Sequence, residues 1–429
     1  MKTIYALIIF GAISFITQAQ NPLSLNDAIQ NALDNNYGIQ ISISKQEIST
    51  IQNSWGAAGR YPYINLTGNA DNSKNMNDTE DFISNRFIGE ASINWTIFDG
   101  FAVKINKTRF EELEQLSKQN TAIMVESTIQ SVVLAYYDAL LQKEKLNTYQ
   151  EVMTLSEDRY KQTKVSKDLG TAVTYHLLQA QNAYLADRSD YLLQEVTYKN
   201  ALRDLNYLMA DKSEVNYQLT DEFKAIPVDY AISDLQAQMQ NNNKSLQNQY
   251  VNQRLLQNAV ASAKSAFMPT LSFKGGAQYN STRNDYEVRG ESWINASKIY
   301  GNFTLSFNLF SGGNKKRALQ IARIEEEVGT VEMNDIKHDL NNSLVNIYEL
   351  FLVRKELLNV ANENMEAAKL NLQISQDKFD SGTINSFNFR DVQNIYLNAS
   401  QKKLEAIYKY IDTHTALLRM VGVIVQEYE

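Results

Sequence analysis

Two stretches of this chain alternate strictly between apolar and polar residues, and each leads into a glycine. Apolar side chains occupy the odd positions of residues 90–97, before Gly100, and the odd positions of residues 302–309, before Gly312. Because successive side chains of a strand point to opposite faces, this spacing predicts two strands, each with one apolar and one polar face. One such strand alone would also suit the edge of a soluble sheet.

A companion strand is expected upstream of the first stretch. Tyr61-Pro62 marks the end of a helix, since the residue before proline is pushed out of helical geometry. Alternation at residues 64–67 then predicts the companion strand, and the polar tract at 71–80 is expected to form a loop before a second strand at about 87–98. Together these features predict a β-hairpin.

Helical periodicity covers most of the remaining chain. The expected helical segments are residues 24–60, 101–167, 171–210 and 230–267. The second contains neither proline nor glycine, and at 1.5 Å per residue it would reach about 100 Å. Segments 171–210 and 230–267 together have a similar reach, so we expect them to stack end to end against one long helix. Leu340, Leu344, Ile347 and Phe351 have the spacing of a coiled-coil seam.

The second half of the chain repeats the first with constant offsets. An offset of 207 carries Pro62 to Pro269, and an offset of 212 carries Phe98 to Phe310. The second offset then holds along the helices, as in Tyr136 with Tyr348, Glu144 with Glu356, Asn147 with Asn359, Gly170 with Gly382, Thr171 with Thr383, Tyr184 with Tyr396 and Leu205 with Leu417. The difference of five residues therefore falls between the strands of each hairpin, where a loop tip tolerates insertions.

These patterns divide the chain into a leader and two repeats. Lys2, the short apolar run 4–16 and the small-residue site ending at Ala19 are typical of a secretory signal. The expected divisions are a signal peptide (1–19), a first repeat (20–210, with a hairpin at 61–98), an equatorial linker (211–229), a second repeat (230–422, with a hairpin at 269–310) and a C-terminal tail (423–429).

The strands raise the question of a membrane. Transmembrane strands need about 9–11 residues with one lipid-facing side, and a membrane sheet must close so that no edge is left unpaired. Four strands cannot close, because the smallest bacterial barrels have about eight. The sequence therefore predicts a barrel shared between chains. A periplasmic coiled-coil scaffold with soluble hairpins is the alternative, although it would leave apolar strand faces exposed.

Composition and missing motifs narrow the function further. A formal charge of −8 without a basic stripe argues against a nucleic-acid partner. The absence of cysteine excludes disulfides, thiolate metal sites and a lipid anchor at the leader. The three histidines are far apart in the sequence, and no phosphate-binding loop is present. We therefore expect no catalytic residues, no metal and no cofactor.

The two hairpins, their Tyr-Pro and Met-Pro starts, the Phe-Asp-Gly and Phe-Ser-Gly-Gly ends and the Gly-Thr helix breaks resemble the TolC outer-membrane efflux family over roughly residues 23–422. The resemblance implies an α+β membrane protein: a homotrimer in outer-membrane lipid with a 12-stranded β-barrel and a periplasmic barrel of antiparallel coiled-coil helices. It implies an exit duct working with a periplasmic adaptor and an inner-membrane transporter, in a tripartite efflux pump or alternatively in type I polypeptide secretion.

The same resemblance suggests functional residues. Gly170, Thr171, Gly382 and Thr383 would form the adaptor-facing tip of the helices. Asp391 matches a pore-facing aspartate of the family, and three copies would form a negatively charged ring that selects cations. Asn388 and His176 stand where the family can carry further acids, so the expected channel gate consists of Asp391, Asn388 and His176.

Overall fold

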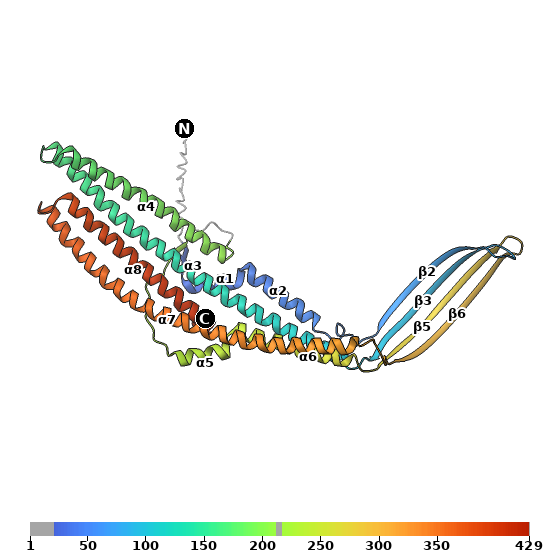
Figure 1. Ribbon diagram of the computed structural model, residues 1–429. Helices are drawn as coiled ribbons and strands as arrows, with labels where there is room; N and C mark the ends of the chain where they lie inside the picture. Colours follow the sequence, from blue (N-terminus) through green and yellow to red (C-terminus); the bar gives the residue numbers. More distant parts are fainter. Residues whose placement is uncertain (1–20, 212–216, 429) are drawn as a thin grey trace, which may run out of the picture.

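A computed structural model describes residues 21–211 and 217–428, so the expected signal peptide lies outside the described residues. A long layer of helices continues at one end into a four-stranded antiparallel sheet (Figure 1). The elements are β1 (Asn21–Leu23), α1 (Leu25–Asn35), α2 (Tyr37–Gln52), β2 (Tyr63–Asn75), β3 (Phe82–Phe98), α3 (Ala102–Asp168), α4 (Thr174–Leu208), β4 (Tyr217–Leu219), α5 (Ile232–Asn242), α6 (Lys244–Ser265), β5 (Thr270–Tyr286), β6 (Gly290–Ser306), α7 (Asn314–Asp380), α8 (Ser386–Met420) and α9 (Ile424–Tyr428). Among the described helices, none is long and apolar enough to cross a membrane.

The helices preserve the duplication residue for residue. Helices α3 and α7 both have 67 residues, and α4 and α8 both have 35. An offset of 212 carries the bounds of α3 onto those of α7, and the bounds of α4 onto those of α8. Helix α3 packs against α4 and α8, and α8 packs against α7, which gives the order α4-α3-α8-α7 across the layer. Helices α4 and α7 therefore form its two outer edges (Figure 1).

Shorter helices stack end to end along α3 and α7, but in a different pairing from the one expected. The Asn36 side chain caps α2 by accepting from Gly38 N–H at 2.8 Å, and it donates to the Leu208 carbonyl at the end of α4, also at 2.8 Å. Asn243 likewise caps α6 and donates to the Met420 carbonyl at the end of α8. Segment 171–210 thus stacks on α2, and not on 230–267. The cap at Asn36 also divides the single helix expected over 24–60.

The sheet has the order β2-β3-β5-β6 and contains both expected hairpins. Its strands are longer than predicted: the loop expected at 71–80 is confirmed at 76–80, but β2 continues to Asn75, so the prediction is wrong for residues 71–75. This segment is polar on both faces, so its hydrophobic pattern gives no strand signal, yet its backbone pairs with β3 throughout. In the other direction, β6 ends at Ser306, before the alternation ends at Leu309.

The two hairpins share one register. Tyr63 pairs with Asn94 and Thr270 pairs with Ser306, which are the same positions under the offsets of 207 and 212. The five extra residues of the second hairpin lie beyond the common ladder. They extend the ladder from the 13 pairs of β2 with β3 to the 17 pairs of β5 with β6 and shorten the turn.

One face of the sheet is apolar and the other is polar, as predicted. The cross-strand row Ile64, Ile93 and Gly275 lies on the apolar face, beside the row Trp95, Phe273 and Phe303. The alternate row Tyr63, Asn94, Lys274 and Asn302 lies on the opposite face. Ile64 is 79% exposed and Phe303 is 71% exposed, so this chain alone does not cover the apolar face.

The main core lies at the middle of the helical layer. Within it, β1 pairs in parallel with β4, which falls inside the expected linker at 211–229, and α9 follows inside the expected tail. The Tyr136 hydroxyl donates to the Leu23 carbonyl, and the Tyr348 hydroxyl donates to the Tyr230 carbonyl, both at 2.9 Å. The repeats therefore conserve contacts as well as lengths.

Candidate gate at the helical tips

The turns that join α3 to α4 and α7 to α8 have the same construction. Gly170 N–H donates to the Lys167 carbonyl, and Thr171 N–H donates to the Ser166 carbonyl at 2.8 Å. Gly382 and Thr383 make the equivalent bonds in the second turn. These paired bonds form a Schellman motif, in which the residue after the helix adopts the left-handed conformation that glycine favours. The φ angles of Gly170 and Gly382 are 77° and 73°.

The tips are open to contact from outside the chain. Gly170, Thr171, Gly382 and Thr383 are all exposed, and a Cβ placed on either glycine would meet no atom within 4 Å. The glycines therefore serve the backbone turn and leave the surface above it free. This geometry suits a docking surface, and the role expected for these residues stays a prediction.

A cleft lies between the two turns, and both turns line it. Thr171 and His176 contribute from the first turn and from α4, while Asp380 and Gly382 contribute from the second. His176 is exposed, and its ring lies 5.6 Å from that of Tyr175. Of the three expected gate residues, only His176 lines this cleft.

Asn388 and Asp391 lie instead on an exposed face of α8. They are one helical turn apart, and Asn388 N–H donates to the side chain of the N-cap residue Asn385 at 2.9 Å. Within the described residues, the Asp391 carboxylate has neither a hydrogen-bond nor an ion-pair partner. The structure therefore places Asn388 and Asp391 on one face of α8, whereas His176 belongs to α4 and lines the cleft.

Sequence reasoning missed a buried ionic cluster just above the tips. Arg390 forms two hydrogen bonds with the Asp187 carboxylate, at 2.5 and 2.7 Å, and thereby joins α8 to α4. The Ser156 hydroxyl of α3 donates to the same carboxylate, while Arg159 donates to the Ser386 carbonyl at 3.2 Å. The cluster thus links α3, α4 and α8 at the level of the tip.

Burial removes the charged groups of this cluster from water. Asp187 is 3% exposed and Arg159 is 4% exposed. Desolvation, assisted by the neighbouring charge of Arg390, lowers the pKa of the Arg159 guanidinium to about 10. One carboxylate therefore compensates two guanidinium groups. The family resemblance indicates Asp391 and not its neighbour Arg390, and the sequence alone does not show which of two adjacent charges turns toward another helix. No group of acidic or histidine side chains within 21–211 and 217–428 could hold a metal ion.

Comparison with known proteins places this architecture in a family. Outer membrane protein TolC of Vibrio cholerae is 21% identical over 440 residues, covering all of this chain and 97% of that protein. The solved structure of the CmeC outer membrane channel of Campylobacter jejuni has 17% identity and a TM-score of 0.75, covering 93% of this chain and 86% of that one. The open state of the MtrE outer membrane channel of Neisseria gonorrhoeae has 16% identity and a TM-score of 0.69, covering 93% and 89%.

The structural likenesses, at these identities, show the fold. A model of the outer membrane efflux protein family matches residues 28–210 and 235–423, most of each repeat. This chain therefore belongs to the outer membrane efflux protein family.

Proposed function

We propose that three copies of this chain form an exit duct that conducts substrates passively from the periplasm across the outer membrane, as part of a tripartite efflux pump. The family resides in the outer membrane and extends into the periplasm. A periplasmic adaptor docks on the tips formed by Gly170, Thr171, Gly382 and Thr383. An inner-membrane transporter supplies the energy, because the sequence contains no phosphate-binding loop.

The observation that carries this proposal is the pair of open edges in the sheet. Strands β2 and β6 each pair with one neighbour among the described strands, and the sheet has an uncovered apolar face. In lipid, every backbone polar group must be paired, so β6 of one chain must meet β2 of another.

The need for a passage sets three as the smallest number of copies. Two copies give eight strands, and side chains fill the interior of a barrel of that size. Three copies give twelve strands and leave a lumen lined by the polar face that contains Asn94, Lys274 and Asn302. In the trimer, Asp391, Asn388 and His176 surround the constriction near the tips.

The proposal is tested by the mass of the detergent-extracted protein, measured by light scattering with correction for bound detergent, together with its membrane fraction. We expect three chains per particle, recovered with the outer membrane, and ion conductance in a planar bilayer. A monomer or dimer released without detergent would contradict the duct and favour a periplasmic scaffold.

A further inference from the structure

Specific hydrogen bonds recur in both repeats. Asn147 donates to Glu144 at 3.4 Å in α3, and Asn359 donates to Glu356 at 3.5 Å in α7. The two asparagine caps and the two tyrosine contacts described above recur in the same way. When both residues of a contact are identical in the two repeats, we therefore expect their counterparts to form the same contact.

One tyrosine–glutamate pair that is identical in both repeats forms its hydrogen bond only in one of its two copies among the described residues. The Tyr396 hydroxyl of α8 donates to the Glu151 carboxylate of α3 at 2.8 Å, across the boundary between the repeats. An offset of 212 relates these residues to Tyr184 and Glu363, which have the same side chains. Tyr184 lies on α4 and Glu363 on α7, at opposite edges of the helical layer, so the two cannot meet within one chain (Figure 1).

The surroundings of Tyr184 also match those of Tyr396. Tyr396 belongs to a cluster that includes Leu372 of α7. The counterpart of Leu372 is Tyr160 of α3, and its ring stacks on that of Tyr184 with centroids 6.2 Å apart. Within the described residues, neither the Tyr184 hydroxyl nor the Glu363 carboxylate has a hydrogen-bond partner.

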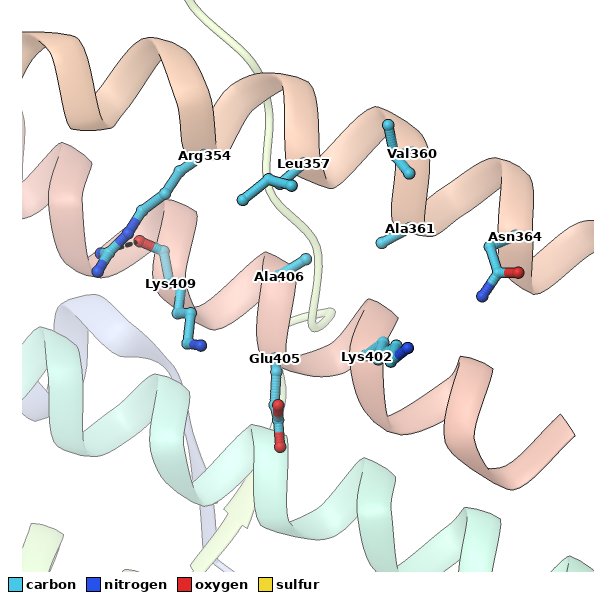
Figure 2. Close-up of a pocket in the computed structure, with 9 residues that line it drawn as sticks. All are labelled: Arg354, Leu357, Val360, Ala361, Asn364, Lys402, Glu405, Ala406 and Lys409. Atoms are coloured by element: carbon cyan, nitrogen blue, oxygen red, sulfur yellow. Dashed lines mark hydrogen bonds between the residues drawn. The ribbon is translucent and has the colours of Figure 1, made fainter. Parts of the chain in front are cut away.

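A groove lies open where the counterpart of the α3–α8 contact would form. In α3, Lys145 pairs with Glu405 at 3.0 Å, the Thr148 and Ser400 hydroxyls lie 2.9 Å apart, and Tyr149 accepts from Gln401 at 2.6 Å. The counterparts of these three α3 residues are Leu357, Val360 and Ala361. All three line the groove between α7 and α8 that Figure 2 shows.

The exposed faces of α4 and α7 have the chemistry of a helix–helix seam. On α7, Val353, Leu357 and Val360 follow steps of four and three, and each is 53–54% exposed. On α4, Leu178, Leu185 and Leu192 recur every seven residues, and each is 49–52% exposed. Such spacing is typical of antiparallel coiled-coil packing and leaves an apolar stripe on both edges of the layer.

We propose that α4 of one protomer fills the α7–α8 groove of its neighbour in the register of the internal α3–α8 contact, with the Tyr184 hydroxyl donating to Glu363 of the neighbouring protomer. This proposal rests on the assembly proposed above. The occupant is a second copy of this chain, because α4 is the described helix that the duplication relates to α8.

The absence of cysteine from the sequence makes the register directly testable. The double variant Arg188→Cys with Val360→Cys places thiols at the counterparts of Ser400 and Thr148, whose hydroxyl oxygens lie 2.9 Å apart. We expect a disulfide between protomers after mild oxidation, seen as linked dimers and trimers on a non-reducing gel. The matched control, Thr148→Cys with Ser400→Cys, is expected to form a disulfide within one chain and to leave the apparent mass unchanged.

A second pair distinguishes the register from the assembly itself. Glu195→Cys with Val360→Cys moves one thiol by one heptad, about 10 Å along α4, and should give no linked species. A trimer by light scattering that links through 195 and 360, or through neither pair, would overturn this inference and leave the duct intact. A monomer by light scattering would overturn the proposed function first.

Tyr184→Phe and Glu363→Gln should each lower the dissociation temperature of the trimer, and the double variant should lower it no further than the larger single effect.

Discussion

Glu126 of α3 is an ionisable side chain buried in the helical layer. It is 5% exposed, and its Oε1 atom has no hydrogen-bond partner in the described structure. Desolvation raises the pKa of the Glu126 carboxyl to about 7, against the opposing charges of Lys244 and Arg419. These two cations belong to the ends of α6 and α8 that meet at the Asn243 cap, so the carboxyl lies beside a helix joint.

Glu126 should make stability depend on pH. Between about pH 4.5 and pH 7 the folded chain retains a proton that the unfolded chain has lost, so the stability contributed by this group falls as pH rises and is lost above pH 7. Glu126→Gln should remove that dependence and raise the free energy of unfolding at pH 8 by about 3 kcal/mol at most. Thermal unfolding between pH 5 and 8 measures the effect. The exposed Glu332→Gln is the control, and an unchanged pH profile in the Glu126 variant would contradict the assignment.

Among the elements, periodicity predicted the long helices and the turn glycines well, because each depends on local spacing. It failed where long-range partners decide the structure. The pattern at 24–60 is helical throughout, yet the Asn36 side chain donates to the end of α4 and divides the expected helix into α1 and α2. Residues 71–75 carry no apolar alternation and become strand only because β3 lies beside them. The pairing of β1 with β4 joins residues far apart in sequence and had no local signal.

The candidate site followed the same rule. The exposed tip residues could be proposed from a glycine and its offset of 212, since a helix end is a local feature. The ion pair of Asp187 with Arg390 could not be proposed from the sequence, because it depends on α4 and α8 lying side by side in the fold. A single charge at an otherwise apolar heptad position is the signal that could have indicated it, since Arg390 is followed at steps of seven by Leu397, Leu404, Ile411 and Leu418.

Asp187→Asn should loosen the tip. The change leaves the Arg159 and Arg390 charges without their shared carboxylate, and breaking a buried ion pair costs about 3–5 kcal/mol. Hydrogen exchange of the backbone amides at 166–171 and 378–383 should become faster, while amides at the Asn36 and Asn243 joints should be unaffected. Asp190→Asn, at an exposed position on the same helix, serves as the matched control. Equal exchange in both variants would show that the cluster does not hold the tips.

In the whole molecule, contacts between the repeats follow one pattern from end to end. Strand β3 meets β5, and α3 meets both α6 and α8, so the first repeat presents the same edge to the second along its entire length. The second repeat has the equivalent edge on β6 and α7. A rotation that repeats the internal contact between chains therefore continues sheet and helical layer together, and it places equivalent residues of every chain at one height.

Asp391 acquires its expected role only through that rotation. A single exposed carboxylate has little effect on ion flow, whereas three at one height form a ring that attracts cations. Asp391→Asn should reduce the preference for cations over anions, measured as a smaller reversal potential in a planar bilayer under a KCl gradient. It should also weaken block by multivalent cations. Asp377→Asn, at an exposed position on α7, keeps the same change in net charge and should leave selectivity unaltered. If both variants retain the original selectivity while trimers still conduct, the constriction lies elsewhere in the duct and Asp391 is a solvated surface residue.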